Sequence, residues 1–166
     1  IPTRTSPGLA TAPVAHEAFA SGNVDTGLIA RHQDALFPVA APVGDDTLLA
    51  AALAETRALV EERGVAASAS GDPHSPWHAV DPWWVNSASH AIPVVFADAD
   101  GTHHAAAVRR DGDGWSVTLP TGATTARVNR RDGRMVIATS GAEFTATVVR
   151  LGDERHVFCH GEQRKL

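Results

Sequence analysis

The chain has 166 residues and a mass of 17.4 kDa, and 43% of its residues are hydrophobic while 20% are charged. This length predicts one domain, or one domain plus a fragment, with enough apolar material for a core. The formal net charge of −5 and the lack of a basic run argue against nucleic acid as a partner. No apolar stretch approaches the roughly 18 residues of a membrane span, which argues against membrane insertion.

The first 44 residues are interrupted by prolines, so only short helices are expected there. One is predicted from about Pro13 to Ala20, with Gly22 just beyond its end. Another is predicted after Asp25, and it ends by Pro38. Both segments are too short to be stable alone, so we expect them to pack against another body.

The clearest helix is predicted from about Asp46 to Arg63, with Asp45 and Asp46 offering a cap and favourable charge, and with Gly64 at the end. An apolar stripe recurs at helical spacing. Its members are Leu49, Ala52, Leu53, Thr56, Leu59 and Val60. Alanines at the margins of the stripe predict a helix surrounded by other elements. The alternative is an ordinary amphipathic surface helix.

From about Asn86 onward the pattern changes to short runs rich in Val, Thr and Ile, separated by turn clusters about ten residues apart. This spacing is typical of an antiparallel meander in a sandwich or barrel. The predicted strands are 90–97, 103–110, 115–119, 124–130, 134–139, 142–151 and 154–160, and residues 162–166 resemble the start of another. In the sixth strand, Phe144, Ala146 and Val148 share one face.

Between the helix and the strands lies a loop, residues 65–85, in which three prolines forbid a regular helix. It contains Trp77, Trp83 and Trp84, three of the four tryptophans of the chain. Indole rings concentrate at the energetic centres of protein interfaces, so the loop is a candidate partner-binding site. The alternative is that these rings plug the end of the barrel or cover the helix.

Catalytic and metal-binding motifs are not found in the sequence. Pro76 lies between His74 and His78 and removes the helix that would bring both to one face. His156 and His160 share a strand face but lie about 13 Å apart. We expect Cys159 to be a buried small hydrophobe, and the Asp98–Gly101 segment to be a hairpin turn and not a calcium loop.

Two segments resemble α subunits of biotin-dependent acyl-CoA carboxylases, and the resemblance covers most of the chain. The run 16–32 is similar to the end of their biotin carboxylase region, through Phe19, the Gly22-Asn23-Val24 triplet and Ile29. The Ser75-Pro76-Trp77 triplet, followed by Trp83, resembles the start of the strands in subunits of the 3-methylcrotonyl-CoA type.

The resemblance implies that residues 1–43 are the tail of a biotin carboxylase domain and residues 44–166 most of a linking (BT) domain. That domain is an antiparallel β-barrel of about seven or eight strands around a central helix. It docks the α subunit on the carboxyltransferase β subunit, partly through the loop between helix and strands. The implied partner-binding residues are His74, Ser75, Pro76, Trp77, Trp83 and Trp84.

The parent enzyme implied by the resemblance is a hetero-oligomeric ligase that uses biotin and ATP with a divalent metal. In this segment we expect no cofactor and no catalytic residue, since Lys165 and Met135 do not form the Met-Lys-Met sequence that carries biotin. Its partners would be the β subunit and the biotin carboxylase domain of the same subunit. The single cysteine fits a reducing compartment, the cytoplasm or, in a eukaryote, the mitochondrial matrix.

Two other classes of protein are compatible with this sequence pattern. A free-standing ligand-binding β-barrel would need an interior cavity, which a helix inside the barrel would fill. An enzyme with a site at the mouth of the barrel would need converging titratable groups, and the sequence shows none.

Overall fold

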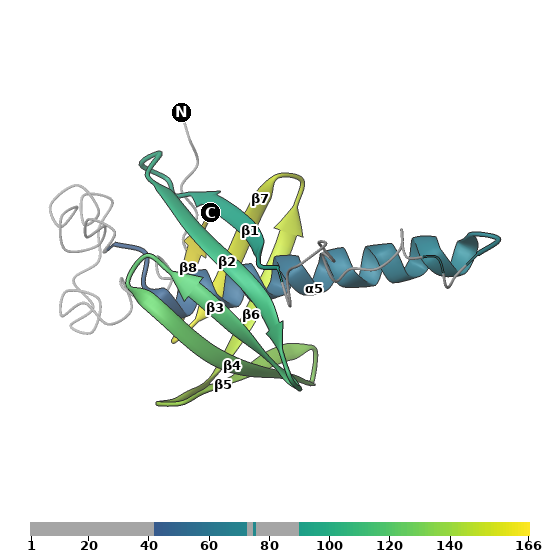
Figure 1. The fold of residues 1–166 in the computed structure, drawn as a ribbon. Coiled ribbons are helices and arrows are strands. Elements are labelled where there is room, and N and C mark those ends of the chain that lie inside the picture. Colours follow the sequence, from purple (N-terminus) through teal and green to yellow (C-terminus); the bar gives the residue numbers. More distant parts are fainter. Residues whose placement is uncertain (1–41, 73–74, 76–89) are drawn as a thin grey trace, which may run out of the picture. The chain divides into compact units, whose positions relative to one another are not determined.

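The computed structural model describes residues 42–72, 75 and 90–166. Residues 43–160 and 164–166 form one compact unit, in which one helix, α5 (Asp45–Ala69), precedes an antiparallel sheet (Figure 1). The strands are β1 (Ile92–Ala97), β2 (His103–Asp111), β3 (Gly114–Leu119), β4 (Gly122–Arg131), β5 (Arg134–Thr139), β6 (Glu143–Leu151), β7 (Glu154–Cys159) and β8 (Glu162–Lys165). The short helices expected before residue 42 lie outside the described residues.

The turns set the strand boundaries, and for this reason the predicted strands are confirmed to within two residues at either end. In the Asp132-Gly133 and His160-Gly161 turns both central residues have positive φ, which is the geometry of a type I′ hairpin. The twist of this turn matches the twist of the strands it joins. The segment predicted as the start of a further strand is β8.

The eight strands follow one another in sequence order, so β1 and β8 are the two edges of a single sheet. The sheet is therefore open, and the prediction of a closed barrel is not confirmed. Closure depends on the stagger summed over all the strands, a quantity that an alternating sequence pattern does not specify. Within the described residues the unit is mostly β, with one helix.

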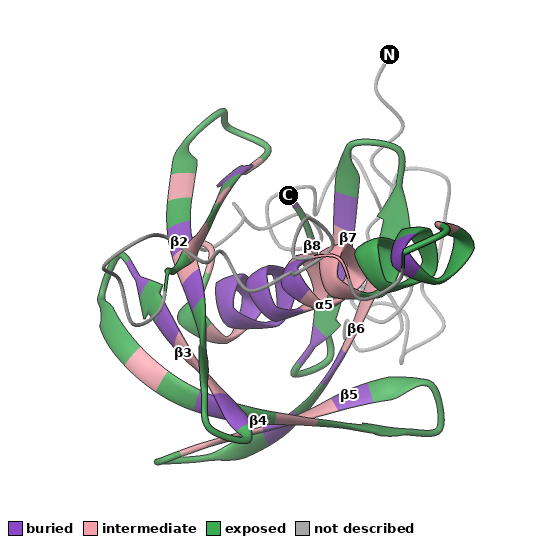
Figure 2. Cartoon of the chain, turned by 45° about the vertical axis from the view of Figure 1, so that its right-hand side comes forward, coloured by how far each residue is buried: buried purple, intermediate pink, exposed green. Residues whose placement is uncertain are grey.

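The sheet curves around the N-terminal half of α5 (Figures 1 and 2). The six consecutive residues from Leu48 to Leu53 are all buried, and six residues at 100° each span every side of a helix. Strands β1, β2, β3, β6 and β7 contact the helix. The prediction of a surrounded helix is confirmed for this half, and the amphipathic surface helix is excluded for it.

Strands β2, β3, β5 and β7 contribute inward-facing residues to the core around the helix, and a period of two places these on one face of the sheet. Val108, Val117, Ile137 and Val157, from four different strands, are almost fully buried. Phe144 and Ala146 of β6 are buried on the same face, with Val148 packed against the core as predicted. The core is thus the space between the curved sheet and α5.

The helix starts within one residue of the predicted start, but the predicted cap and the predicted C-terminal end are wrong. The N-cap is Gly44, whose carbonyl oxygen accepts hydrogen bonds from the amides of Thr47 and Leu48. At the other end α5 runs past Gly64 to Ala69. One glycine costs a helix only about 1 kcal/mol relative to alanine, and the small helix-forming residues that follow continue the hydrogen-bonded turns.

Candidate functional site

Five of the six predicted partner-binding residues of the loop fall outside the described residues. Of the six, only Ser75 is described, half-buried, with its amide donating to the carbonyl of Asp72 at 3.2 Å. His74, Pro76, Trp77, Trp83 and Trp84 lie outside the described residues, so docking through these side chains stays a prediction.

What the structure does describe is how α5 is held in the sheet. Arg155 of β7 is 9% exposed and points inward, between the helix and the sheet. Its guanidinium donates two hydrogen bonds to the Glu55 carboxylate, through Nε and, at 3.0 Å, through Nη2. Nη1 donates to the carbonyls of Gly152 and Glu154. The hydrogen bonds to the Glu55 carboxylate raise the pKa of Arg155, which favours the charged guanidinium.

This ion pair was not predicted from the sequence, although the sequence contains one indication of it. Arg155 alternates with Val157 and Cys159 on the buried face of β7. A charged residue at an apolar position of an alternating strand indicates a buried partner, because an isolated charge there would be strongly destabilising. The identity of that partner, 100 residues earlier in the chain, follows only from the fold.

Further polar contacts join the first turn of α5 to the sheet. The Thr121 hydroxyl donates to Asp45 at 2.6 Å, and His160 Nε2 donates to Asp46 at 2.8 Å. The two aspartates therefore bind turns of the sheet and do not cap the helix. Cys159 is buried as predicted, with its sulfur 3.4 Å from the hydroxyl of Thr47.

From residue 61 to the end of α5 every residue except Ala67 is exposed, and Figure 2 shows this part of the helix outside the sheet. The Arg150–Glu62 ion pair, at 2.8 Å and exposed on both sides, is a contact between this half of the helix and the end of β6. One turn further on, Val65 is 71% exposed. The C-terminal half of α5 thus presents both charged and apolar groups at the surface.

An open hollow of about 560 Å³ lies over strands β3, β4 and β5. Its lining residues are Asp111, Gly112, Asp113, Gly114, Trp115, Thr125, Ala126, Arg127, Ala138, Thr139 and Ser140. The charged groups Asp113 and Arg127 bind each other at 3.3 Å, and Arg110 lies 4.8 Å from the ring centre of Trp115. The hydroxyl of Thr139, another lining residue, donates to the carbonyl of Ala142 at 3.0 Å.

The β1–β2 turn is a hairpin turn, as predicted. Oδ1 of Asp98 accepts hydrogen bonds from the amides of Asp100 and Thr102, and Oδ2 accepts one from His104 Nε2 at 3.0 Å. The described part of the chain contains no group of three or more His, Cys, Asp or Glu residues that could hold a metal ion. It also contains no helix with the length and apolar character of a membrane span.

The Asp98–His104 contact gives a pH dependence with a definite sign. The hydrogen bond from His104 lowers the pKa of Asp98 below its ordinary value of 3.8. A carboxyl group whose pKa is depressed by folding stabilises the fold above its unfolded pKa, and this contribution is lost as the pH falls through the folded pKa. We expect the Asp98 carboxyl carbon to titrate below pH 3.8 in NMR spectra, and closer to 3.8 in His104→Ala. An unchanged midpoint in the variant would contradict the assignment.

Comparison with known proteins adds one relationship. No protein-family model matches the chain. Over 71 residues it is 38% identical to the mitochondrial methylcrotonoyl-CoA carboxylase subunit alpha of Dictyostelium discoideum. The match covers 43% of this chain and 10% of that subunit, so the chain corresponds to a small part of it. This similarity supports a relationship to biotin-dependent carboxylase α subunits.

Proposed function

We propose that the chain is the linking segment of a biotin-dependent acyl-CoA carboxylase α subunit, and that it docks this subunit on the carboxyltransferase β subunit. The observation that carries the proposal is the 38% identity to a carboxylase α subunit over 71 residues. The order of elements supports it, since a covered helix precedes an antiparallel meander as the sequence resemblance implies. Residues 1–43 would be the tail of the biotin carboxylase domain, and 44–166 the linking domain, with the sheet closed into a barrel in the assembled subunit.

In this proposal the segment supplies geometry and not chemistry. The parent enzyme would use ATP, a divalent metal and bicarbonate to carboxylate biotin, and then transfer the carboxyl group to an acyl-CoA. The residues of this chain do not fit a biotin site, because its one lysine, Lys165, is flanked by arginine and leucine and binds Glu154 at 2.9 Å. The biotin-bearing and ATP-binding parts would lie elsewhere in a cytoplasmic or mitochondrial hetero-oligomer.

A ligand-binding barrel is disfavoured by the position of the helix. The side chains of Leu49 and Leu53 and the inward residues of the strands occupy the space that a ligand would need. A helix on the outside of the sheet would have favoured that alternative.

The loop hypothesis is tested by mutating the tryptophans. We expect the full chain to retain the β subunit of the same organism in a pull-down, and expect Trp77→Ala and the Trp83→Ala/Trp84→Ala double variant each to weaken binding by about tenfold or more. The reason is that a buried aromatic anchor contributes about 2 kcal/mol or more to an interface. Phe158→Ala, which removes a partly exposed aromatic ring near the end of β7, is the matched control. If both loop variants bind as well as the parent chain, the loop is not the docking element.

A further inference from the structure

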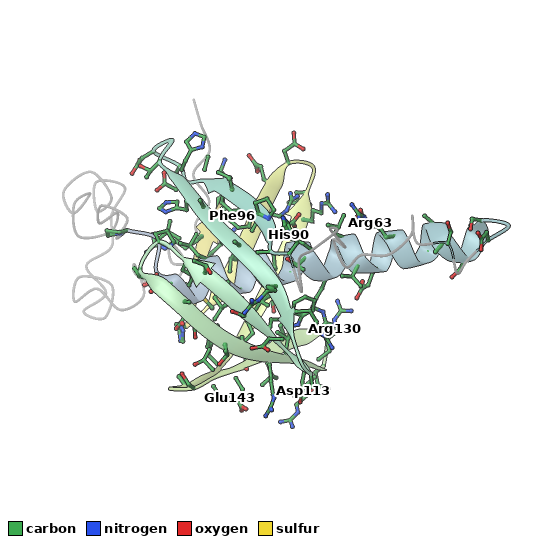
Figure 3. All side chains as sticks on the ribbon, in the orientation of Figure 1. Arg63, His90, Phe96, Asp113, Arg130 and Glu143 are labelled. Carbon is green, nitrogen blue, oxygen red and sulfur yellow. The ribbon has the colours of Figure 1, made fainter. Side chains whose placement is uncertain are left out.

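Charge is divided between the two ends of the sheet. Turns of an antiparallel meander alternate between the ends, so the β2–β3, β4–β5 and β6–β7 turns share one end, from which the C-terminal half of α5 emerges (Figure 1). We call this the exit end. All described Lys and Arg residues lie on the helix or strand halves toward it: Arg57, Arg63, Arg109, Arg110, Arg127, Arg130, Arg131, Arg134, Arg150, Arg155, Arg164 and Lys165. Figure 3 labels Arg63 and Arg130 there.

The opposite end of the same unit carries carboxylates. Asp45 and Asp46 begin α5, Asp98 and Asp100 lie in the β1–β2 turn, and Glu143 begins β6. Among the described residues, no Lys or Arg side chain lies at that end. The unit is therefore electrically polar along the helix, although the whole chain has a net charge of −5.

The β4–β5 hairpin concentrates this charge without neutralising it. Arg131 and Arg134 are direct cross-strand partners beside the two-residue turn. Like charges at such positions are destabilising, because their Cβ atoms are only about 5 Å apart. Within the described part of the chain, the exposed guanidinium groups of Arg130, Arg131 and Arg134 have no ion pair. The free chain thus carries a repulsion that an anionic partner would relieve.

Apolar side chains accompany the arginines at the exit end. Leu151, the last residue of β6, is 59% exposed, and Val65 is exposed on the emerging helix. The Arg150–Glu62 ion pair joins the residue before Leu151 to the turn of α5 that precedes Val65. Arginine is enriched at protein–protein interfaces, and the exposed apolar side chains beside it offer area that a partner would bury.

We propose that the exit end is a docking surface for an acidic surface on a partner protein, recognised through Arg130, Arg131 and Arg134. The partner's identity, the carboxyltransferase subunit, rests on the proposed function, whereas its acidic character rests on the charges above. A protein surface fits better than nucleic acid. Asp111, Asp113, Asp132 and Asp153 stand among the arginines, and they would repel a continuous polyanion but pair with cations of a mixed protein surface.

The first test does not depend on the proposed function. The ¹⁵N-labelled full chain is titrated with a ten-residue peptide in which glutamate alternates with serine, at low and at high salt. We expect chemical-shift changes at the three exit-end turns that diminish at high salt, and several-fold weaker binding by the Arg131→Ser/Arg134→Ser double variant. Changes at the opposite end, no changes, or equal binding by the variant would overturn the inference. Tighter binding of a DNA duplex carrying the same number of charges would overturn the choice of a protein partner.

The second test uses the β subunit of the same organism and measures association rates. The Arg131→Ser/Arg134→Ser variant should associate about tenfold more slowly at low salt. Ala99→Glu/Ala123→Glu, which removes the same net charge at the opposite end, should associate at nearly the parent rate. If the parent chain does not bind the subunit, the proposed function fails. The peptide titration then still shows whether the exit end binds acidic groups. If parent and Ser variant associate equally fast, the inference fails and the proposed function stands.

A third readout separates docking from a structural role of the arginines. Because Arg131 and Arg134 repel each other in the free chain, their replacement by serine should raise the melting temperature by about 1–3 °C. A lower melting temperature would show that the arginines stabilise the fold, which would overturn the inference. If the parent chain self-associates in a salt-sensitive way and the variant does not, the partner is a second copy of this chain. That result would also overturn the inference.

Discussion

Arg155→Met is expected to lower the free energy of unfolding by about 3 kcal/mol or more, measured by urea denaturation. The substitution leaves the Glu55 carboxylate, whose side chain is only 18% exposed between α5 and β7, without its two charge-assisted hydrogen bonds. It also removes the donors that satisfy the carbonyls of Gly152 and Glu154. The Glu55→Leu/Arg155→Met double variant should regain much of the loss, because no charge then remains buried.

The matched control is Arg150→Met. Arg150 binds Glu62 of the same helix, but both side chains are about half exposed, so water screens the interaction. We expect this variant to lose less than about 1 kcal/mol. Equal losses for the two arginine variants would contradict the view that Arg155 acts from a desolvated position.

Enlarging any one of Ala50, Ala51 and Ala52 to methionine is expected to lower the free energy of unfolding by about 1–3 kcal/mol. These three consecutive alanines are fully buried and point to three different sides of α5. A methionine at each position would have to displace the curved sheet or adopt a strained rotamer. The urea concentration at the midpoint of unfolding measures the effect for each variant. The slope of the free energy of unfolding against urea concentration is compared with that of the parent chain.

Ala66→Met and Ala69→Met are the controls, because both alanines are exposed on the part of the helix beyond the sheet. Their free energies of unfolding should stay within about 0.5 kcal/mol of the parent value. If one of the three inner alanines tolerates methionine as well as Ala66 does, one side of the helix is open and α5 is not surrounded.

The sequence predicted the strands well because their limits are local. The Asp132-Gly133 turn, for example, can adopt positive φ at both residues, and this geometry brings Arg131 opposite Arg134. The burial of Leu48 to Leu53 on every side was also predictable, since alanines fill the margins of the apolar stripe.

What the sequence did not predict depends on distant contacts or on small energy differences. The continuation of α5 through Gly64 reflects a balance of about 1 kcal/mol between one glycine and the alanines after it. The Glu55–Arg155 pair joins residues 100 positions apart, and the open edge between β1 and β8 depends on stagger accumulated over the whole sheet. The charge division between the two ends becomes visible only when alternate turns are assigned to opposite ends.

We propose that this chain docks on a carboxyltransferase subunit. Sedimentation velocity of the full chain mixed with the β subunit of the same organism tests it most directly. At micromolar concentrations of both, we predict a faster-sedimenting complex that contains both proteins and weakens as salt is added. Two species that sediment separately at every ratio, with the chain folded by circular dichroism, would contradict it.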